Sequence, residues 1–411
     1  MTNKPMDIPK QLVWQAWKRV KAASGGPGVD GVSIKAFEES LSGNLYKLWN
    51  RMASGSYFPK PVKQVAIPKE KGTRYLGVPT VTDRIAQTVV LIQMEKALEP
   101  VFLDESYGAR RGKSALDAVA KCRVNCWVND FVIDLDWKSF FTTIDHQLLL
   151  KAVDKHAKTN WEKLYIRRWL EVPISTVTGE KLAPNGVGIP QGATISPLLS
   201  NLFLHYGFDR WMKTNYPEAH FERYLDDVVI HCRTLRRSEQ LLDAIRVRLS
   251  EVKLALNEEK TQITYCRSGE KKWHGYGDVK CTFTFLGFEF KPRVMKTNRG
   301  KLTRTFSPAV GTKGKKRLRK KLRDLNAFRQ TQLSIEGLSK LASPVIRGWI
   351  NYFKAFRPSE MCRSLLDINR ALSKWISRKY KCKRRDAVKH LRRIQKESPN
   401  LFPQWIIGYR A

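Results

Sequence analysis

Two adjacent aspartates, Asp226 and Asp227, lie between Tyr224-Leu225 and the apolar run Val228-Val229-Ile230. β-Branched residues favour strands, and Asp favours tight turns because its side chain bonds to nearby backbone. The pattern therefore predicts a β-hairpin with both carboxylates at its tip. Two anionic groups crowded at one turn repel each other unless a cation offsets them. The stretch is either a divalent-metal site or a solvated turn, and other residues must decide between these interpretations.

A second strand that ends in carboxylates is predicted over residues 131–136. Its sequence, Phe-Val-Ile-Asp-Leu-Asp, has the apolar, β-branched character of a buried strand. The two-residue period of a strand places Asp134 and Asp136 on the same face. An unpaired buried carboxylate is costly, and metal ligation is one way to stabilise it. Asp136, at the strand end, is the better candidate ligand; Asp134 could equally be a salt-bridge partner or a residue that supports the ligands.

The charge balance indicates a polyanionic partner. The 411 residues include 75 Lys and Arg against 38 Asp and Glu, a formal net charge of +37. Such a surface binds phosphate backbones by releasing their counterions. An anionic membrane is the competing interpretation, but no apolar run approaches the roughly twenty residues of a membrane span, and the first residues do not form a secretory signal. We therefore expect a soluble, cytoplasmic protein of two or three domains that does not bind membranes.

The seven cysteines are an odd number and lie far apart, which does not indicate a disulfide framework in a chain of this length. A reducing compartment fits this pattern. Cys122 and Cys126 have the spacing of one helical face, but no Cys-x-x-Cys or His-x-x-x-His pair accompanies them. Buried thiols are therefore the favoured interpretation over structural zinc.

Two loops carry groups that could contact a nucleotide. Lys69 and Arg74 flank a predicted hairpin turn at Gly72, where an ammonium and a planar guanidinium could clamp a triphosphate, although lysines near turns are often only solvated. Between residues 186 and 197, glycines would let the backbone approach a flat ligand, and Gln191 offers both a donor and an acceptor.

Other segments outline the organisation of the chain. We predict a helix that ends near Met52, a strand over 254–261 and a polar, glycine-containing linker over about 291–314. Basic amphipathic stretches follow at 315–325 and 379–393. Charge runs are usually solvated faces, but two of them in so basic a chain favour nucleic-acid binding.

Asp136, Asp226 and Asp227, from two strands, suit a two-metal nucleotidyl-transfer site. In such sites one Mg²⁺ activates a 3′-hydroxyl and the other stabilises the triphosphate and pyrophosphate oxygens. Lys69 and Arg74 would then help to neutralise the triphosphate.

The chain resembles bacterial group II intron-type reverse transcriptases, through an ordered series of motifs over nearly its whole length. The stretches that carry the resemblance are Gly26 to Ser33, Tyr57 to Gln87, Ser106 to Ser114, Phe131 to Phe141, Gly188 to Pro197, Tyr224 to Asp227, Lys260, Phe285 to Phe288, Arg347 to Phe353, Trp375 to Lys381 and Pro399 to Trp405.

The resemblance implies an α+β fold of the right-hand polymerase type, with fingers, a palm with an antiparallel sheet, and an all-α thumb or maturase domain. The expected division is residues 1–115 for the N-terminal extension and fingers, 116–290 for the palm with remaining fingers elements, and 291–411 for a linker and the helical thumb or maturase domain. Because the chain stops soon after Trp405, we expect no DNA-binding and His-Asn-His endonuclease domains.

The resemblance also implies roles for single residues. Asp136, Asp226 and Asp227 would hold two Mg²⁺ ions, for which Mn²⁺ can substitute. The nucleotide-binding residues would be Lys69, Arg74, Phe141, Gln191, Gly192 and Lys260, and Phe141 would be the gate that excludes a 2′-hydroxyl. Tyr224 and Leu225 would lie beside the primer end. Leu225 occupies a position usually held by Ala, and we expect its branched side chain to crowd the primer terminus.

The function implied is an RNA-directed DNA polymerase that extends the 3′-hydroxyl of a DNA primer with dNTPs on an RNA template and also copies DNA. Three alternatives stay open: a maturase that binds group II intron RNA as a splicing cofactor, a group II-like enzyme acting in host DNA repair, and a palm polymerase that makes RNA. The oligomeric state is also open.

Overall fold

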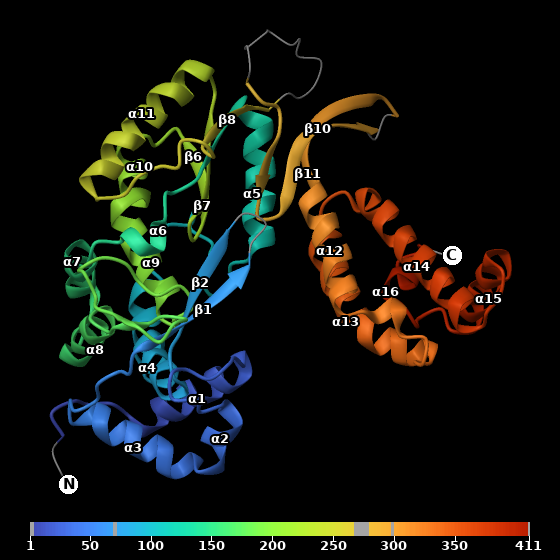
Figure 1. Cartoon of the computed structure of the whole chain (residues 1–411). Helices are drawn as coiled ribbons and strands as arrows, with labels where there is room; N and C mark the ends of the chain where they lie inside the picture. Colours follow the sequence, from blue (N-terminus) through green and yellow to red (C-terminus); the bar gives the residue numbers. More distant parts are fainter. Residues whose placement is uncertain (1–3, 69–71, 267–278, 297–299, 410–411) are drawn as a thin grey trace. The chain divides into compact units, whose positions relative to one another are not determined.

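The computed structural model describes residues 4–68, 72–266, 279–296 and 300–409. The chain forms two compact units, each built from separate stretches of sequence. The first comprises Met1–Ser114, Leu135–Val228 and Glu239–Thr261, and the second comprises Ala115–Asp134, Val229–Ser238 and Gln262–Ala411. The elements of each unit are labelled in Figure 1.

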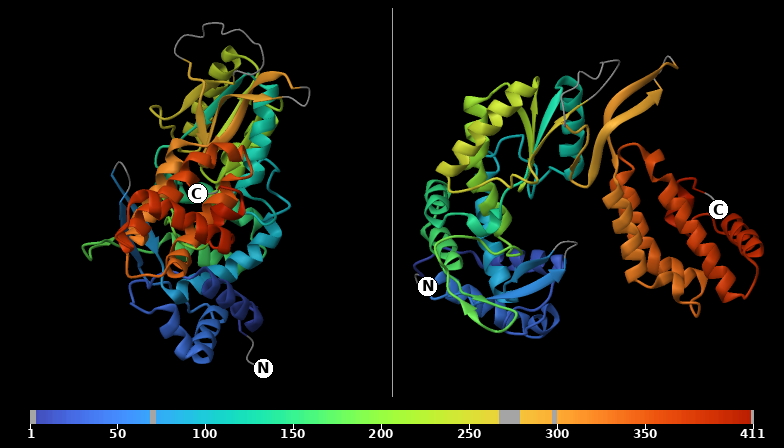
Figure 2. Two further views of the ribbon diagram at one scale, coloured as in Figure 1. Left: turned by 90° about the vertical axis from the view of Figure 1, so that its right-hand side faces the viewer. Right: turned by 45° about the horizontal axis from the view of Figure 1, so that its top comes forward.

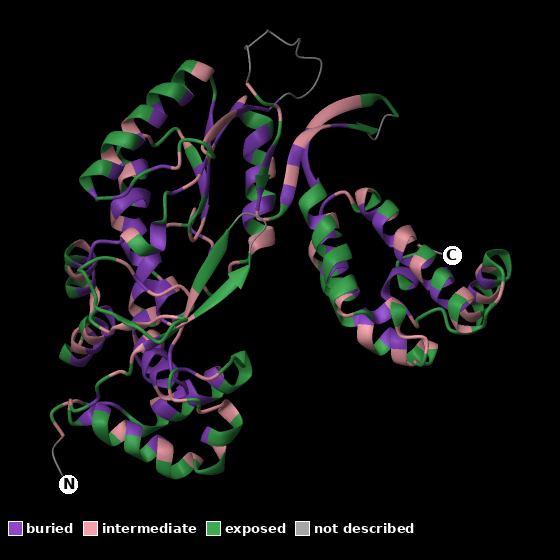
Figure 3. Ribbon diagram, in the orientation of Figure 1, coloured by how far each residue is buried: buried purple, intermediate pink, exposed green. Residues whose placement is uncertain are grey.

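The first unit is built around helix α4 (Val81–Leu98), which is buried almost all round (purple in Figure 3). Thr80 begins this helix, because its hydroxyl accepts a hydrogen bond from the Asp83 backbone N at 3.1 Å. The surrounding helices are α1 (Lys10–Ala23), α2 (Ile34–Glu39), α3 (Leu41–Ala53), α6 (Phe140–Thr143), α7 (His146–His156), α8 (Asn160–Leu170), α9 (Ser196–Leu204), the π-helix η1 (His205–Asp209), α10 (Arg210–Asn215) and most of α11 (Leu235–Glu251).

The described strands form three sheets, with the orders β2-β1-β4-β5, β6-β7-β3-β8 and β11-β10-β9. β3 pairs antiparallel with β8, and β10 pairs antiparallel with both β9 and β11. The strands are β1 (Val62–Pro68), β2 (Thr73–Val78), β3 (Phe131–Leu135), β4 (Ile174–Ser175), β5 (Lys181–Leu182), β6 (His220–Tyr224), β7 (Asp227–Cys232), β8 (Gln262–Tyr265), β9 (Phe283–Phe285), β10 (Phe288–Lys296) and β11 (Leu302–Val310).

The helices that follow β11 lie side by side in both views of Figure 2, coloured orange to red. Their apolar faces are buried and their basic faces exposed (Figure 3). They are α12 (Thr312–Asp324), α13 (Ile335–Phe353), α14 (Cys362–Lys379), α15 (Arg384–Glu397) and α16 (Pro403–Ile406), with short 3-10 turns at Ala327–Arg329 and Pro358–Met361. The second unit also contains α5 (Ala115–Val128). Helices and mainly antiparallel sheets in these proportions confirm the α+β class.

Within the described residues, no helix combines the length and the apolar character that a membrane span needs.

Three local expectations were wrong. The helix expected to end near Met52 is divided at Ser40 into α2 and α3, because Ser40 leaves the helical conformation. The strand expected over 254–261 is a turn with one isolated bridge, from Leu256 to Trp137. The backbone forms a hydrogen-bonded turn here, because Lys260 N and Thr261 N both donate to the Asn257 carbonyl. The linker expected over 291–314 is mostly the β10–β11 hairpin and the start of α12.

Phe288 anchors the junction between β10 and the helical part of the second unit. Its fully buried ring lies 5.1 Å from Tyr352, 4.9 Å from Phe353 and 5.3 Å from Phe356, measured between ring centroids. Aromatic contacts of this kind add to the free energy gained by burial.

We predict that Phe288→Ala lowers the free energy of unfolding of the second unit by about 3–5 kcal/mol, because it leaves a cavity among these rings. Urea denaturation followed by tryptophan fluorescence measures the loss. Val294→Ala is the matched control on the same strand, since Val294 is 56% exposed, and it should change stability by less than about 0.5 kcal/mol. Equal losses in the two variants would contradict the assignment.

Candidate active site

The β6–β7 hairpin presents the two adjacent aspartates, as expected. Tyr224 ends β6, Leu225 and Asp226 form the turn, and Asp227 begins β7. The strands are held by burial, because Phe221 and Val228 to Ile230 are all at most 3% exposed. The two carboxylates are therefore fixed to a rigid element, but at its solvent-facing end.

The turn has a backbone conformation that is unusual for a branched residue. Leu225 has a φ of 57°, in the left-handed region that normally favours glycine. The backbone of Gly108 lies directly against it: a Cβ atom at Gly108 would be 2.5 Å from Leu225 N and 2.9 Å from Tyr224 C. Gly108 thus permits a contact with the turn that a larger residue would block. The expected crowding of a primer by Leu225 stays a prediction.

A fully buried guanidinium, that of Arg223, supports the turn. Its Nε donates to Asp209 Oδ1 at 2.7 Å and its Nη2 donates to Asp209 Oδ2. Nη1 donates to the Leu225 carbonyl at 3.2 Å and to Asn201 Oδ1 at 2.8 Å, and Nη2 also donates to Ser106 Oγ at 2.9 Å. Neither Arg223 nor Asp209 has any exposed side-chain surface. A paired charge of this kind, with its donors satisfied, fixes the carbonyl of the turn.

The sequence did not indicate this support. Asp209 lies in a π-helix, an element often found at functional sites, and Ser106 is more than a hundred residues before Arg223. The available signal was the charge of Arg223 in the strand that leads into the turn, since a charge that becomes buried in a sheet requires a partner.

Asp136 follows β3 and is held through its backbone. Its carbonyl accepts from Asn257 N at 2.8 Å, and its N donates to Thr261 Oγ1 at 3.2 Å. The same turn carries Lys260, whose Nζ lies 3.1 Å from Asp136 Oδ2. That oxygen is buried and makes no hydrogen bond. Lys260 therefore offsets part of the charge of Asp136, and this ion pair is the contact that Oδ2 makes.

The three carboxylates influence one another. Desolvation by the surrounding protein, followed by the charges of Asp226 and Asp136, raises the pKa of Asp227 to about 6, even though part of the side chain reaches solvent. Three neighbouring carboxylates, whose mutual repulsion a cation would relieve, fit a hard divalent cation, which prefers carboxylate ligands. Asp134 differs from this group, because its Oδ2 accepts a hydrogen bond from Gln262 at 3.2 Å.

The β2 strand and the loop before α9 bring together three of the expected nucleotide-binding residues. Arg74 Nε donates to Gln191 Oε1 at 2.8 Å, and Gly77 N donates to the Gln191 carbonyl at 2.7 Å. A Cβ atom at Gly192 would be 2.8 Å from the Gly77 carbonyl oxygen. The loop can therefore lie this close to β2 only with glycine at position 192. Arg74 is exposed beside this loop. Lys69, expected on the same hairpin, lies outside the described residues.

Phe141 lies in α6 and is held by the start of the same loop. Its carbonyl accepts from Ile189 N at 2.7 Å, and its ring packs edge-on against Phe140 with centroids 5.2 Å apart. Gly188, with a φ of 86°, allows the loop to approach the Thr142 backbone. The ring of Phe141 is only 7% exposed.

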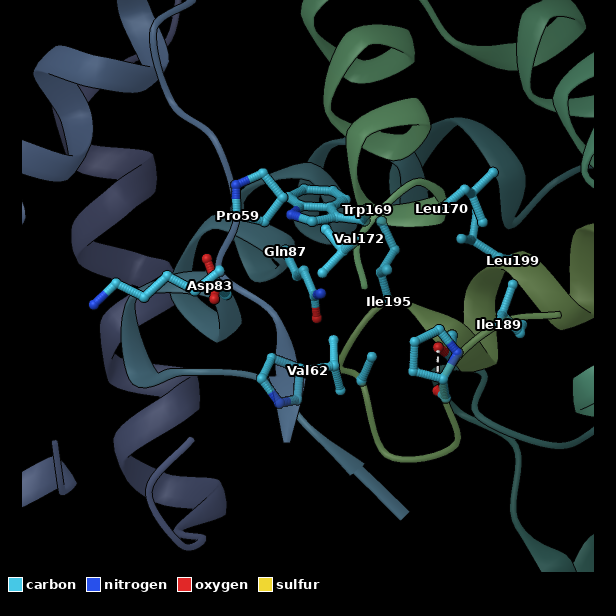
Figure 4. A pocket seen from close by; sticks show the side chains of 15 residues that line it. Pro59, Val62, Asp83, Gln87, Trp169, Leu170, Val172, Ile189, Ile195 and Leu199 are labelled. Atoms are coloured by element: carbon cyan, nitrogen blue, oxygen red, sulfur yellow. Dashed lines mark hydrogen bonds between the residues drawn. The ribbon is translucent and has the colours of Figure 1, made fainter. Parts of the chain in front are cut away.

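A small pocket lies behind this loop (Figure 4). The side chains of Trp169, Val62 and Ile195 border it, and Gln87 reaches from α4 to accept a hydrogen bond from Thr194 N at 3.0 Å. None of the three carboxylates lines it. Its apolar walls support the loop that carries Gln191 and Gly192.

Comparison with known proteins gives two matching family models. One, described as reverse transcriptase (RNA-dependent DNA polymerase), matches residues 67–290, and the other, described as group II intron, maturase-specific domain, matches residues 315–394. The chain is 30% identical to Protein YkfC of Escherichia coli over 61% of this chain and 76% of that protein. It is 32% identical to the group II intron-encoded protein LtrA of Lactococcus lactis over 39% of this chain, a match that spans 27% of LtrA.

We predict that Arg223→Met lowers the free energy of unfolding of the first unit by about 3–5 kcal/mol, because it leaves the Asp209 carboxylate buried and unpaired. Chemical denaturation measures this loss. The double variant Arg223→Met/Asp209→Leu removes both charges and should recover about 1–2 kcal/mol of it. A double variant that is less stable than Arg223→Met would show that the ion pair is not what holds this region.

The raised pKa of Asp227 predicts a pH dependence in the presence of EDTA. A carboxyl with a folded pKa above its unfolded value stabilises the fold at low pH, and this contribution is lost as pH rises through about 6. Asp227→Asn should therefore increase the melting temperature at pH 7.5 and change it little at pH 4. Asp154→Asn is the control, because Asp154 is an exposed aspartate of the same unit. An equal increase in melting temperature at pH 7.5 and pH 4 would show that the ionisation of Asp227 does not cause the effect.

Proposed function

This chain belongs to the group II intron type of the reverse transcriptase family, and from that membership we propose that it extends the 3′-hydroxyl of a DNA primer with dNTPs on an RNA template. Family membership by itself implies nucleic-acid binding and a general dependence on divalent metal. The observation that carries the specific proposal is the cluster of Asp136, Asp226 and Asp227, in which desolvation and the charges of Asp226 and Asp136 raise the pKa of Asp227.

Asp136, Asp226 and Asp227 would hold two Mg²⁺ ions, for which Mn²⁺ could substitute. When bound, the ions supply a more acidic 3′-hydroxyl and a stabilised pyrophosphate leaving group. The chain itself provides carboxylates on a rigid hairpin, so their positions do not depend on the substrate. Lys260, 3.1 Å from Asp136, limits the repulsion among the three carboxylates before the ions bind.

The incoming dNTP would be bound by residues of the loop before α9 and of the β1–β2 hairpin. Arg74 already contacts Gln191 and is exposed, so its guanidinium could turn toward the phosphates, together with Lys69. Gln191 and Gly192 would lie against the nucleotide, and Lys260 would add a cation near the triphosphate. Tyr224 and Leu225 would lie beside the primer terminus.

Phe141 would select deoxynucleotides. Its backbone is fixed by Ile189 and its ring by Phe140, so the ring has little freedom to move away from a sugar 2′-hydroxyl. This supports a DNA product over the alternative of RNA synthesis.

The basic helices of the second unit would bind the template and primer, or DNA as a template. On α12, exposed cations surround the buried Leu318 and Leu322, namely Lys313, Lys316, Arg317, Lys320, Lys321 and Arg323. The maturase-specific match begins within α12 and ends in α15. That match favours a second function, in which these helices bind group II intron RNA and assist its splicing.

We assign residues 1–115 to an N-terminal extension and fingers, 116–290 to a palm with remaining fingers elements, and 291–411 to the thumb or maturase part. The carboxylate hairpin and the antiparallel β3–β8 pair support the palm assignment. In the last segment, the β10–β11 hairpin takes the place of the expected linker.

The test of the proposed function is extension of a labelled DNA primer on an RNA template with Mg²⁺ and dNTPs. Asp226→Ala should reduce extension by about a hundred-fold or more, because a metal ligand contributes several kcal/mol to the transition state. Asp154→Ala is the control at an exposed aspartate of the same unit and should keep the wild-type rate. Extension by Asp226→Ala at the wild-type rate would refute the site assignment.

Phe141→Val should raise the ratio of NTP to dNTP incorporation by about ten-fold or more, because it removes the ring that would meet a 2′-hydroxyl. Phe37→Leu is the control, a buried phenylalanine of the same unit that packs against Trp17, and its ratio should stay near that of the wild type. Measuring kcat/KM for a matched dNTP and NTP pair decides the point. An unchanged ratio in Phe141→Val would mean that the ring only fills space in the core.

A further inference from the structure

Three thiols and one imidazole gather inside the second unit. Cys122 and Cys126 lie on α5, His231 lies in β7, and Cys266 directly follows β8. All four side chains are at most 1% exposed. The sequence predicted buried thiols here, but it gave no reason to expect a histidine beside them.

Three ligand atoms of this cluster are close enough to share one ion. The sulfurs of Cys122 and Cys126 and a ring nitrogen of His231 all lie within 4.8 Å of one another, and Cys126 Sγ is 4.0 Å from His231 Nδ1. Cys266 lies beside Cys126, and each thiol affects the pKa of the other, but the Cys266 sulfur is not within 4.8 Å of all three of these atoms. Cys126 is therefore next to each of the other three groups.

The backbone around the cluster is fixed by regular structure. The four-residue separation of Cys122 and Cys126 places both sulfurs on one face of α5. Cys266 N donates to the Asp130 carbonyl at 2.7 Å, which holds the end of β8 beside the start of β3. The four groups thus come from a helix and two strands of a sheet whose positions do not depend on a ligand.

An imidazole beside buried thiols is more typical of a metal site than of an apolar core. Free cysteines are commonly buried as small apolar side chains, whereas thiols and an imidazole together are usual ligands of zinc. The Cys126 sulfur and His231 Nδ1 are 4.0 Å apart, close enough for both to contact one ion.

We propose that Cys122, Cys126, His231 and Cys266 bind one structural Zn²⁺ ion. Three thiolates and one imidazole are a common tetrahedral ligand set for zinc, and full burial leaves no open position, as in structural rather than catalytic sites. Bond lengths of about 2.3 Å to sulfur and 2.0–2.1 Å to nitrogen place tetrahedral ligands roughly 3.5–3.8 Å apart. Cys122, Cys126 and His231 therefore need to move by about 1 Å or less, and Cys266, which lies outside their grouping, turns its side chain toward the ion.

Binding converts three thiols into thiolates and releases three protons to water, while the imidazole coordinates in its neutral form. The resulting site, with three thiolates around a divalent ion, carries one net negative charge. Because the cluster is enclosed, the ion would enter as the second unit folds and would then join α5 to β7 and β8.

The test is the metal content of the full-length chain, purified from cells grown with added zinc and passed through gel filtration. We expect about one zinc per chain by elemental analysis, and less than about 0.2 in the double variant Cys122→Ser/Cys126→Ser. Cys281→Ser/Cys382→Ser is the matched control at two partly exposed thiols of the same unit, and it should keep about one zinc.

A second measurement on the wild type keeps the proposal testable even if the double variant fails to fold. The protein is unfolded and refolded with Co²⁺, whose thiolate complexes absorb visible light strongly when tetrahedral. A cobalt–thiolate band that disappears on addition of Zn²⁺ supports the site. Wild-type protein that contains less than about 0.2 zinc per chain and shows no such band overturns the proposal and leaves a packed cluster of thiols. Neither measurement depends on polymerase activity.

Discussion

The buried ion pair between Arg223 and Asp209 is the interaction on which the carboxylate turn depends. Each charge would be costly alone, because both side chains are fully removed from solvent. The same guanidinium binds the carbonyl of Leu225, whose left-handed conformation costs roughly 1–2 kcal/mol for a residue with a Cβ atom. The hydrogen bonds of Arg223 therefore offset the backbone strain at Leu225 and hold the turn in place. Gly108 contributes by permitting backbone contact from the opposite segment.

Electrostatics at the site follow from this rigidity. A flexible turn would relieve the repulsion among three carboxylates by moving them apart, whereas a fixed turn keeps it. Desolvation, and after it this repulsion, raises the pKa of Asp227. Lys260 reduces the repulsion on the side of Asp136, because the Asn257 turn places it there. The positive surface of the chain has a different role: it attracts polyanions over a distance but is screened by salt, while the carboxylates act on whatever is bound.

The sequence predicted what short-range patterns determine. Apolar, β-branched residues gave the strand that precedes Asp136 and the strand β7 that follows the aspartate pair, and the pair itself gave the turn between β6 and β7. It did not predict contacts between distant segments, such as Arg223 with Asp209, Gly108 with Leu225 or His231 with Cys126. These depend on tertiary packing, which no local spacing encodes. The β10–β11 hairpin was missed for another reason: its outer positions are polar or exposed, so it resembles a linker.

The register of strand β7 determines both the position of Asp227 among the carboxylates and the position of His231 among the thiols. The two-residue period places Asp227, Val229 and His231 on one face, while Val228 and Ile230 occupy the other. A slip by one residue would turn Asp227 away from the carboxylates and His231 away from the thiols at the same time. Apolar burial alone specifies this register weakly, since both faces of the strand are buried and Val, Val and Ile are similar in shape. The polar contacts at its two ends, the Arg223 network before the turn and the thiol–imidazole cluster after it, therefore distinguish the correct register from its neighbours.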